Sequence, residues 1–180
     1  MNSNLFYYMK KILTALLIIT VISCQFSKNE VVNNSDITTV YYFIRHAEKD
    51  RSDTSQKDPE LTKIGIQRAK NWATLFEKVE FDQIFSTDYR RTQQTVKYVS
   101  IEQKVAVHSY DPNDLYNDDF KTLTAGKTIL IVGHSNTTPE FVNAILGIEK
   151  FPHIADSNNA NLYIVSIIEN TRTVQLLTVN

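Results

Sequence analysis

The chain of 180 residues has one cysteine and no run rich in lysine or arginine. A single cysteine excludes a disulfide within the chain. The formal net charge of −1 is close to neutral, so the charge balance does not suggest a basic groove for nucleic acid. No internal repeat, low-complexity segment or second domain is apparent. What remains is an ordinary globular composition in a chain long enough to bury a full core.

The first 23 residues have the pattern of a secretory signal peptide. Two lysines precede an uncharged apolar run over residues 12–22, and the small Ser23 stands just before Cys24. The apolar run is too short for a comfortable membrane span. Met9 is an alternative start, in which case the first eight residues are an extension.

Residues 21–24, Val-Ile-Ser-Cys, resemble the lipobox of bacterial lipoproteins. The resemblance implies that Cys24 is acylated and becomes the new N-terminus, followed by a polar, flexible tether over residues 24–38. The alternative is that Cys24 ends an uncleaved anchor helix. Gln25 stands where an aspartate retains some lipoproteins at the inner membrane. We therefore expect an exported, lipid-anchored protein, in the periplasm or on the outer membrane of a Gram-negative bacterium, with the outer membrane preferred.

The remaining residues, 39–180, alternate between strand and helix patterns. Apolar runs predict strands at residues 40–45, 82–86, 104–108, 127–132, 161–168 and 173–178. Apolar residues at helical spacing predict helices at residues 61–78, 89–100, 113–125 and 138–146. Thr62 is placed to cap the first helix, and Gly147 stands just past the end of the last. This alternation predicts an α/β fold with three layers, α/β/α, around a mostly parallel sheet, and the last two strands form a hairpin at its edge.

Chemically active residues follow the strands at their carboxyl ends, where parallel sheets bind their ligands. Arg45 and His46 follow the first strand, His134 follows the fourth, and Asp111 follows the third. Arg91 lies in the first turn of the helix after the second strand, where a cation is unfavourable unless an anion is close. Arginine forks match phosphate oxygens, and a neutral histidine can attack phosphorus. The pattern predicts a phosphate site that contains a nucleophile.

The motifs at these positions resemble those of the histidine phosphatase superfamily, which also contains the cofactor-dependent phosphoglycerate mutases. Four ordered motifs carry the resemblance: Arg45-His46-Ala47; Leu61-Thr62 with Gly65 and Ala69; Ser86 with Arg91, Gln94 and Thr95; and Gly133-His134-Ser135-Asn136. It extends from about Val40 to the C-terminus. Ala47 replaces the glycine of the signature, the Trp-Glu-Gly segment of the mutases is missing, and no insertion is long enough to form a substrate cap.

The resemblance implies a phosphoglycerate mutase-like fold and a metal-independent phosphomonoester hydrolase with a phosphohistidine intermediate. His46 would be the nucleophile, and Arg45, Arg91 and His134 would hold the phosphoryl group with it. The alternative for the arginines is ion pairing with the acidic loop at residues 50–60. The partner would be a small phosphomonoester or a phosphoprotein, with no cofactor and no nucleic acid. Other functions that fit are a phosphoglycerate-type mutase and a non-catalytic lipoprotein that binds phosphate or phosphoproteins.

The proton donor to the leaving group is expected to be Asp111, with Asp114 and Glu48 as alternatives. We expect no metal site, because the histidines lack a ligand spacing such as His-x-x-x-His and nearby arginines would repel a cation.

Three further residues are weaker candidates. Arg90 is expected to be a solvated helix residue, and His108 a packing or surface residue. His153 lies in a loop and is a candidate to line the entrance of the site.

Overall fold

The structure, a computed structural model, describes residues 37–179. The predicted signal peptide, Cys24 and the tether up to residue 36 lie outside the described residues. The strands are β1 (Thr38–Arg45), β2 (Gln83–Ser86), β3 (Val107–Ser109), β4 (Thr128–Gly133), β5 (Asn161–Ile168) and β6 (Thr171–Thr178). The helices of the described part are α2 (Lys63–Leu75), α3 (Arg90–Gln103), α4 (Asp118–Thr124) and α5 (Thr137–Leu146). None of these helices is both long and apolar enough to cross a membrane.

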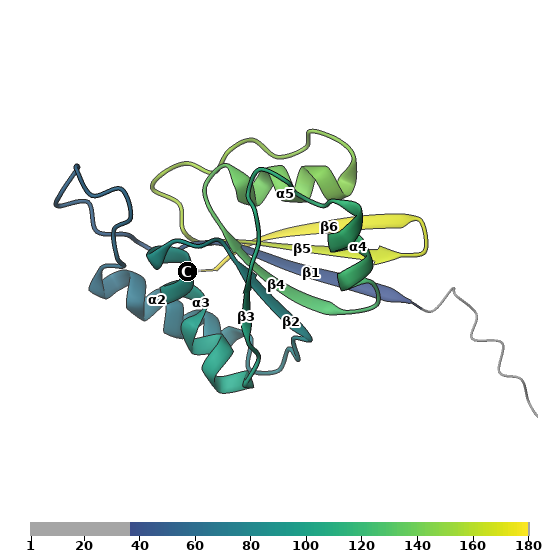
Figure 1. Cartoon of the computed structure of the whole chain (residues 1–180), viewed down its shortest axis with the longest axis horizontal. Helices are drawn as coiled ribbons and strands as arrows, with labels where there is room; N and C mark the ends of the chain where they lie inside the picture. Colours follow the sequence, from purple (N-terminus) through teal and green to yellow (C-terminus); the bar gives the residue numbers. More distant parts are fainter. Residues whose placement is uncertain (1–36, 180) are drawn as a thin grey trace, which may run out of the picture. The chain divides into compact units, whose positions relative to one another are not determined.

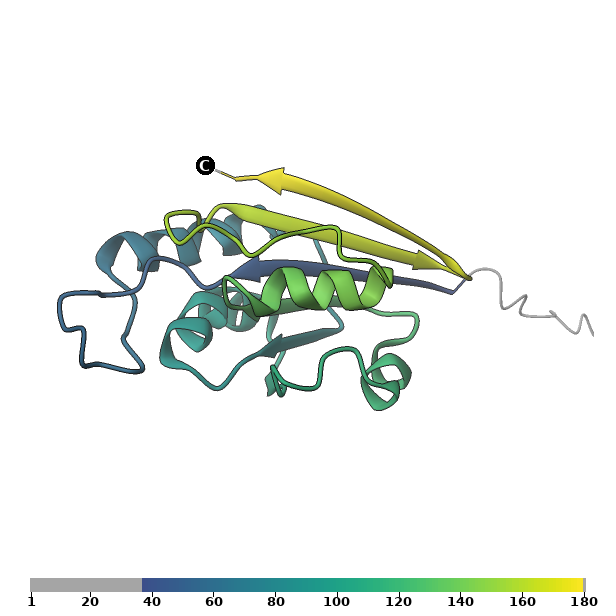
Figure 2. The same ribbon diagram turned by 90° about the horizontal axis from the view of Figure 1, so that it is seen from above.

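The strands form one sheet in the order β3-β2-β4-β1-β5-β6 (Figure 1). The first four strands of this order are parallel, and β5 and β6 are antiparallel to their neighbours. Figure 2 shows β6 at the outer edge, with β5 between it and β1. The turn between β5 and β6 consists of residues 169–170, so the predicted edge hairpin is confirmed.

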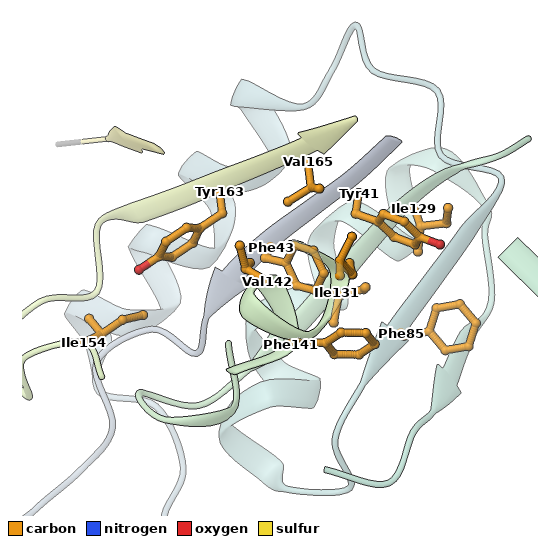
Figure 3. Close-up of a cluster of buried hydrophobic side chains, with 11 residues drawn as sticks. Tyr41, Phe43, Phe85, Ile129, Ile131, Phe141, Val142, Ile154, Tyr163 and Val165 are labelled. Atoms are coloured by element: carbon orange, nitrogen blue, oxygen red, sulfur yellow. The ribbon is translucent and has the colours of Figure 1, made fainter. Parts of the chain in front are cut away.

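Side chains of β1 alternate between two cores, one on each face of the sheet. Tyr41 and Phe43 pack with Phe141 and Val142 of α5, and Figure 3 shows this cluster. On the other face, Ile44 belongs to a cluster with residues of α2 and α3, among them Trp72, Phe76 and Val96. Burial of one such large apolar side chain contributes roughly 1.5–3 kcal/mol. The predicted three-layer α/β/α architecture is therefore confirmed, with α5 and α4 on one face and α2 and α3 on the other (Figure 1).

Two predicted elements were wrong in part. The strand expected from residue 104 begins only at Val107, because Lys104 takes a left-handed conformation (φ 59°) that ends α3. The helix expected from residue 113 begins only at Asp118, because the side chain of Asn117 accepts from the N–H of Phe120 and caps it there. Both boundaries are set by single-residue backbone conformations that hydrophobic periodicity does not detect.

Two glycines hold the backbone close to the functional end of the sheet. A Cβ at Gly65 would overlap the carbonyl group of Glu48, so glycine allows α2 to pack against the segment after β1. A Cβ at Gly133 would lie 2.8 Å from the hydroxyl oxygens of Tyr110 and Thr138. Glycine at 133 therefore permits the tight turn from β4 into α5 that carries His134.

Candidate active site

A cavity of about 380 Å³ opens beyond the carboxyl ends of β1, β2 and β4. The structure brings four of the predicted site residues together in its wall: Arg45, His46, Arg91 and His134. The other residues that line it are Lys49, Tyr89, Pro112, Asn113, Ser135, Asn136, Thr137, Glu140 and Asp156. Residues that are 89 positions apart in the chain thus meet because neighbouring parallel strands end at the same edge.

His46 directly follows β1 and is only 3% exposed. Its Nδ1 lies 2.7 Å from the carbonyl oxygen of Ala47, and since a carbonyl only accepts, Nδ1 carries the proton. The lone pair is then on Nε2, which has no hydrogen-bond partner among the described residues. Burial lowers the pKa of His46 to about 3, and the nearby guanidinium groups of Arg45 and Arg91 also lower it. The ring is therefore neutral at pH 7, the form that can attack phosphorus.

His134 follows β4, and its ring centroid lies 5.7 Å from that of His46. A guanidinium can only donate, so Arg91 Nη2 donates to His134 Nδ1 across 3.3 Å and the ring proton is on Nε2. That Nε2 donates to Thr87 Oγ1 at 2.9 Å, and Thr87 in turn donates to Thr92 Oγ1 at 3.0 Å. Burial and then the neighbouring cations lower the pKa of His134 to about 4. Both histidines are thus neutral in the free protein.

Arg45 is 2% exposed and is bound by the loop between α5 and β5. Its Nη1 donates to the carbonyl oxygens of Ala155, Asp156 and Asn158 at 2.9–3.0 Å, and its Nη2 donates to Asp156 Oδ1 at 2.9 Å. Its Nε is buried and has no partner among the described residues. The guanidinium is therefore held in one orientation, and the protein uses only some of its five N–H groups.

Arg91 is the second cation of the cavity, and its side chain is 12% exposed. It lies over the ring of Tyr89, 4.3 Å from the centroid, and its Nη1 lies 3.4 Å from Asp58 Oδ1. Burial lowers the pKa of Arg91 and the carboxylate of Asp58 opposes that shift. Its Nε is also buried without a partner among the described residues. The two arginines thus each have a buried N–H group that suits an anion.

Solved structures with the same fold include several phosphatases. The protein histidine phosphatase SixA complexed with tungstate is 15% identical, with a TM-score of 0.61 over 77% of this chain and 96% of that one. Phosphoserine phosphatase from Entamoeba histolytica, complexed with 3-phosphoglyceric acid, is 19% identical, with a TM-score of 0.59 over 79% and 98%. A mycobacterial glucosyl-3-phosphoglycerate phosphatase is 14% identical, with a TM-score of 0.57 over 79% and 99%. At these identities the likeness shows the fold. No curated protein sequence matches the chain.

A family model matches the part of the sequence that contains most of the motifs. The model of the histidine phosphatase superfamily (branch 1) matches residues 41–112, which include Arg45, His46 and Arg91. The likeness to this superfamily therefore covers residues 41–112, which include the first three of the four motifs.

The alanine at position 47, where the family signature has glycine, fits the backbone of this chain. Ala47 is fully buried and does not have a positive φ. Its N–H donates to Thr95 Oγ1 at 2.9 Å, and its carbonyl accepts from His46. An alanine side chain is therefore accommodated while the backbone fixes the orientation of the imidazole.

The carboxylates predicted as proton donors lie outside the cavity wall. Asp111 is exposed, and its Oδ1 accepts from the backbone and side chain of Asn113. Asp114 accepts from Asn117, and Glu48 forms an ion pair with Arg68 at 2.8 Å. The assignment of Asp111 as the donor remains a prediction.

The weaker candidates lie around the cavity. Arg90 is 62% exposed and pairs with Glu60, as expected of a solvated helix residue. His108 is exposed on β3. His153 does not line the cavity, but its Nε2 lies 2.8 Å from Oε1 of Glu140, which does. Among residues 37–179, no group of three or more His, Cys, Asp or Glu is arranged to hold a metal ion.

The sequence analysis missed several charged residues of the candidate site. Lys49 lines the cavity three positions after His46, and this proximity in sequence was the only available signal. Asp156 binds Arg45 and Arg51 from an irregular loop. Glu140 projects from α5. Nothing in the periodicity distinguishes these charged residues from ordinary surface residues.

The lowered pKa values predict how the stability of the domain depends on pH. An unfolded histidine titrates near 6.5, whereas folded His46 titrates near 3 and His134 near 4, so the unfolded state binds more protons in between. The free energy of unfolding is expected to be highest above pH 6.5 and to fall on acidification, by up to about 1.4 kcal/mol per pH unit for each histidine. Urea titrations at pH 7, 5.5 and 4.5 measure this. In His46→Gln the free energy of unfolding should fall less on acidification than in the parent protein. An equal fall in the variant and the parent would show that the lowered pKa of His46 is not its cause.

Proposed function

We propose that the domain is a phosphatase that hydrolyses phosphomonoesters without a metal, through a phosphohistidine formed on His46. The observation that carries the proposal is the state of His46. It is buried and neutral, its Nδ1–H is bound by the backbone, and its free Nε2 lies in a cavity with two buried arginines. The phosphatases among the similar structures support the class of reaction, and their printed names describe different substrates.

In the first half of the reaction, His46 Nε2 attacks phosphorus, the P–N bond forms and the bond to the ester oxygen breaks. The N–H groups of Arg45 and Arg91 stabilise the charge on the equatorial phosphoryl oxygens, which is where most of the catalytic effect arises in such reactions. Because the Ala47 carbonyl fixes the tautomer, no proton has to leave the ring before the attack.

In the second half, water attacks the phosphorus of phosphohistidine, and the electron pair of the P–N bond returns to Nε2. His134 lies beside the same phosphoryl group. The bound anion would favour its protonated form, in which Nδ1 changes from acceptor to donor. Its Nε2–H bond to Thr87 keeps the ring in place through this change.

The proposal is tested with the full-length protein and p-nitrophenyl phosphate in the presence of EDTA. We expect steady turnover that EDTA does not reduce, and, after rapid quenching with labelled substrate, protein-bound phosphate that is stable to alkali and labile to acid. Turnover that requires an added divalent cation would contradict the proposal. So would binding of phosphate without turnover, which is the result expected of a non-catalytic binding protein.

A further inference from the structure

We propose that Glu140, in the first turn of α5, gives the proton to the leaving group, and that His153 positions its carboxyl group. This rests on the proposed function, since it assigns a residue to the departure of the ester oxygen. The acid expected from the sequence was Asp111.

The carboxylates that line the cavity, among the described residues, are those of Glu140 and Asp156. Asp156 Oδ1 accepts from Arg45 at 2.9 Å and from Arg51 at 2.7 Å. A proton on this carboxyl would have to compete with two guanidinium groups, and these contacts hold the pKa of Asp156 below its usual value. Asp156 is thus fixed as an anion that orients the arginines.

Glu140 is in a different situation. No arginine or lysine pairs with it among the described residues, and its one hydrogen bond is the 2.8 Å contact between Oε1 and His153 Nε2. That contact leaves Oε2 free for a group in the cavity. A carboxyl group with one oxygen fixed and the other free has the form required of a general acid.

The depth of Glu140 in the cavity also suits this role. Arg45 and His46 at the base are 2% and 3% exposed, whereas the Glu140 side chain is 41% exposed. Glu140 is thus the most solvent-exposed of these cavity residues. In an in-line displacement the leaving oxygen departs on the side opposite the attacking nitrogen, and with His46 at the buried end we infer that it departs toward the exposed end, where Glu140 lies.

The proton of the Glu140 carboxyl group leaves with the alcohol and is replaced from water. His46 Nε2 bonds to phosphorus, the P–O bond to the leaving group breaks, and the carboxyl proton of Glu140 passes to the departing oxygen, which leaves as an alcohol. When water attacks the phosphohistidine, the Glu140 carboxylate takes a proton from the water. Phosphate and the original carboxyl group result.

The experiment compares an alkyl phosphate, glycerol 2-phosphate, with p-nitrophenyl phosphate in the full-length protein. An alkoxide is a poor leaving group that needs a proton, whereas p-nitrophenolate leaves without one. In Glu140→Gln we expect kcat/KM for the alkyl ester to fall on the order of 10²–10³-fold, and for the aryl ester by less than about fivefold. Retained aryl turnover also shows that the variant is folded. Glu102→Gln, on the exposed side of α3, is the matched control and should leave both rates unchanged.

His153→Ala should show the same selective loss for the alkyl ester to a smaller extent, because a positioning residue acts through Glu140. The proposal is overturned if Glu140→Gln lowers both rates equally, or if Asp111→Asn and not Glu140→Gln shows the selective loss. It is also overturned if the parent protein hydrolyses the aryl ester and not the alkyl ester, because the reaction then uses no general acid. A parent that hydrolyses neither ester would instead contradict the proposed function itself.

Discussion

His46→Ala is expected to lower kcat/KM for p-nitrophenyl phosphate by roughly 10⁴-fold, close to the background rate of the assay, since a nucleophile works as a unit with its partners. Among the described residues, the substitution removes the unprotonated ring nitrogen that we propose forms the P–N bond, and the covalently bound phosphate should disappear with it. His134 is no substitute, because its Nε2 carries a proton and is bound to Thr87. Steady-state rates together with rapid-quench labelling measure both effects.

The matched control is His108→Ala. His108 is exposed on β3 and does not line the cavity, so its removal should change kcat/KM by less than twofold. Near-ultraviolet circular dichroism of each variant shows whether the packing of the aromatic core is retained. If His46→Ala keeps its fold and still turns over at more than a tenth of the parent rate, His46 is not the nucleophile.

Arg91→Ala is expected to reduce kcat/KM by about 10²–10³-fold, the usual effect of losing one charged donor to a transition-state oxygen. Among the described residues, the Nε atoms of Arg91 and Arg45 are buried and have no hydrogen-bond partner. Arg91 also donates to His134, so its loss would free that ring. The dissociation constant of a phosphate analogue such as tungstate should rise in parallel.

Arg90→Ala provides a closely matched comparison, since Arg90 is the preceding residue on the same helix. It is 62% exposed and pairs with Glu60, so we expect less than a threefold change in kcat/KM. Equal losses in the two variants would indicate a general electrostatic attraction of the substrate by this surface. Repeating both assays at high salt separates the two explanations, because screening weakens the general attraction and leaves the buried contact largely intact.

Residues at the ends of regular elements could be predicted well from the sequence. Arg45 ends β1, His46 and His134 directly follow β1 and β4, and Thr62 caps α2 as its spacing indicated. In these cases hydrophobic periodicity fixes the position of the element and therefore of its end. The four motif residues met in one cavity because parallel strands share a carboxyl edge.

Residues positioned by loops could not be predicted in this way. Asp156 reaches Arg45 across 111 positions in the sequence, on a segment without periodicity. Glu140 belongs to a predicted helix, but which of its faces meets the cavity depends on the turn at Gly133. Asp111 has the right place in the chain order, and its carboxylate is bound by the turn that follows it. The positions of such side chains depend on local hydrogen bonds between side chains and the backbone, which compete with regular secondary structure.

The loop between α5 and β5 that holds Arg45 has a consequence for how orthophosphate, the product, affects the rate of the proposed reaction. Three carbonyl oxygens and Asp156 fix this guanidinium in the free protein, so the cradle is complete before an ester arrives. A guanidinium held in advance in this way would bind phosphoryl oxygens, which orthophosphate presents as well as any ester. If the proposed function holds, free phosphate would therefore compete with the ester for the same arginines, and hydrolysis would slow where phosphate accumulates.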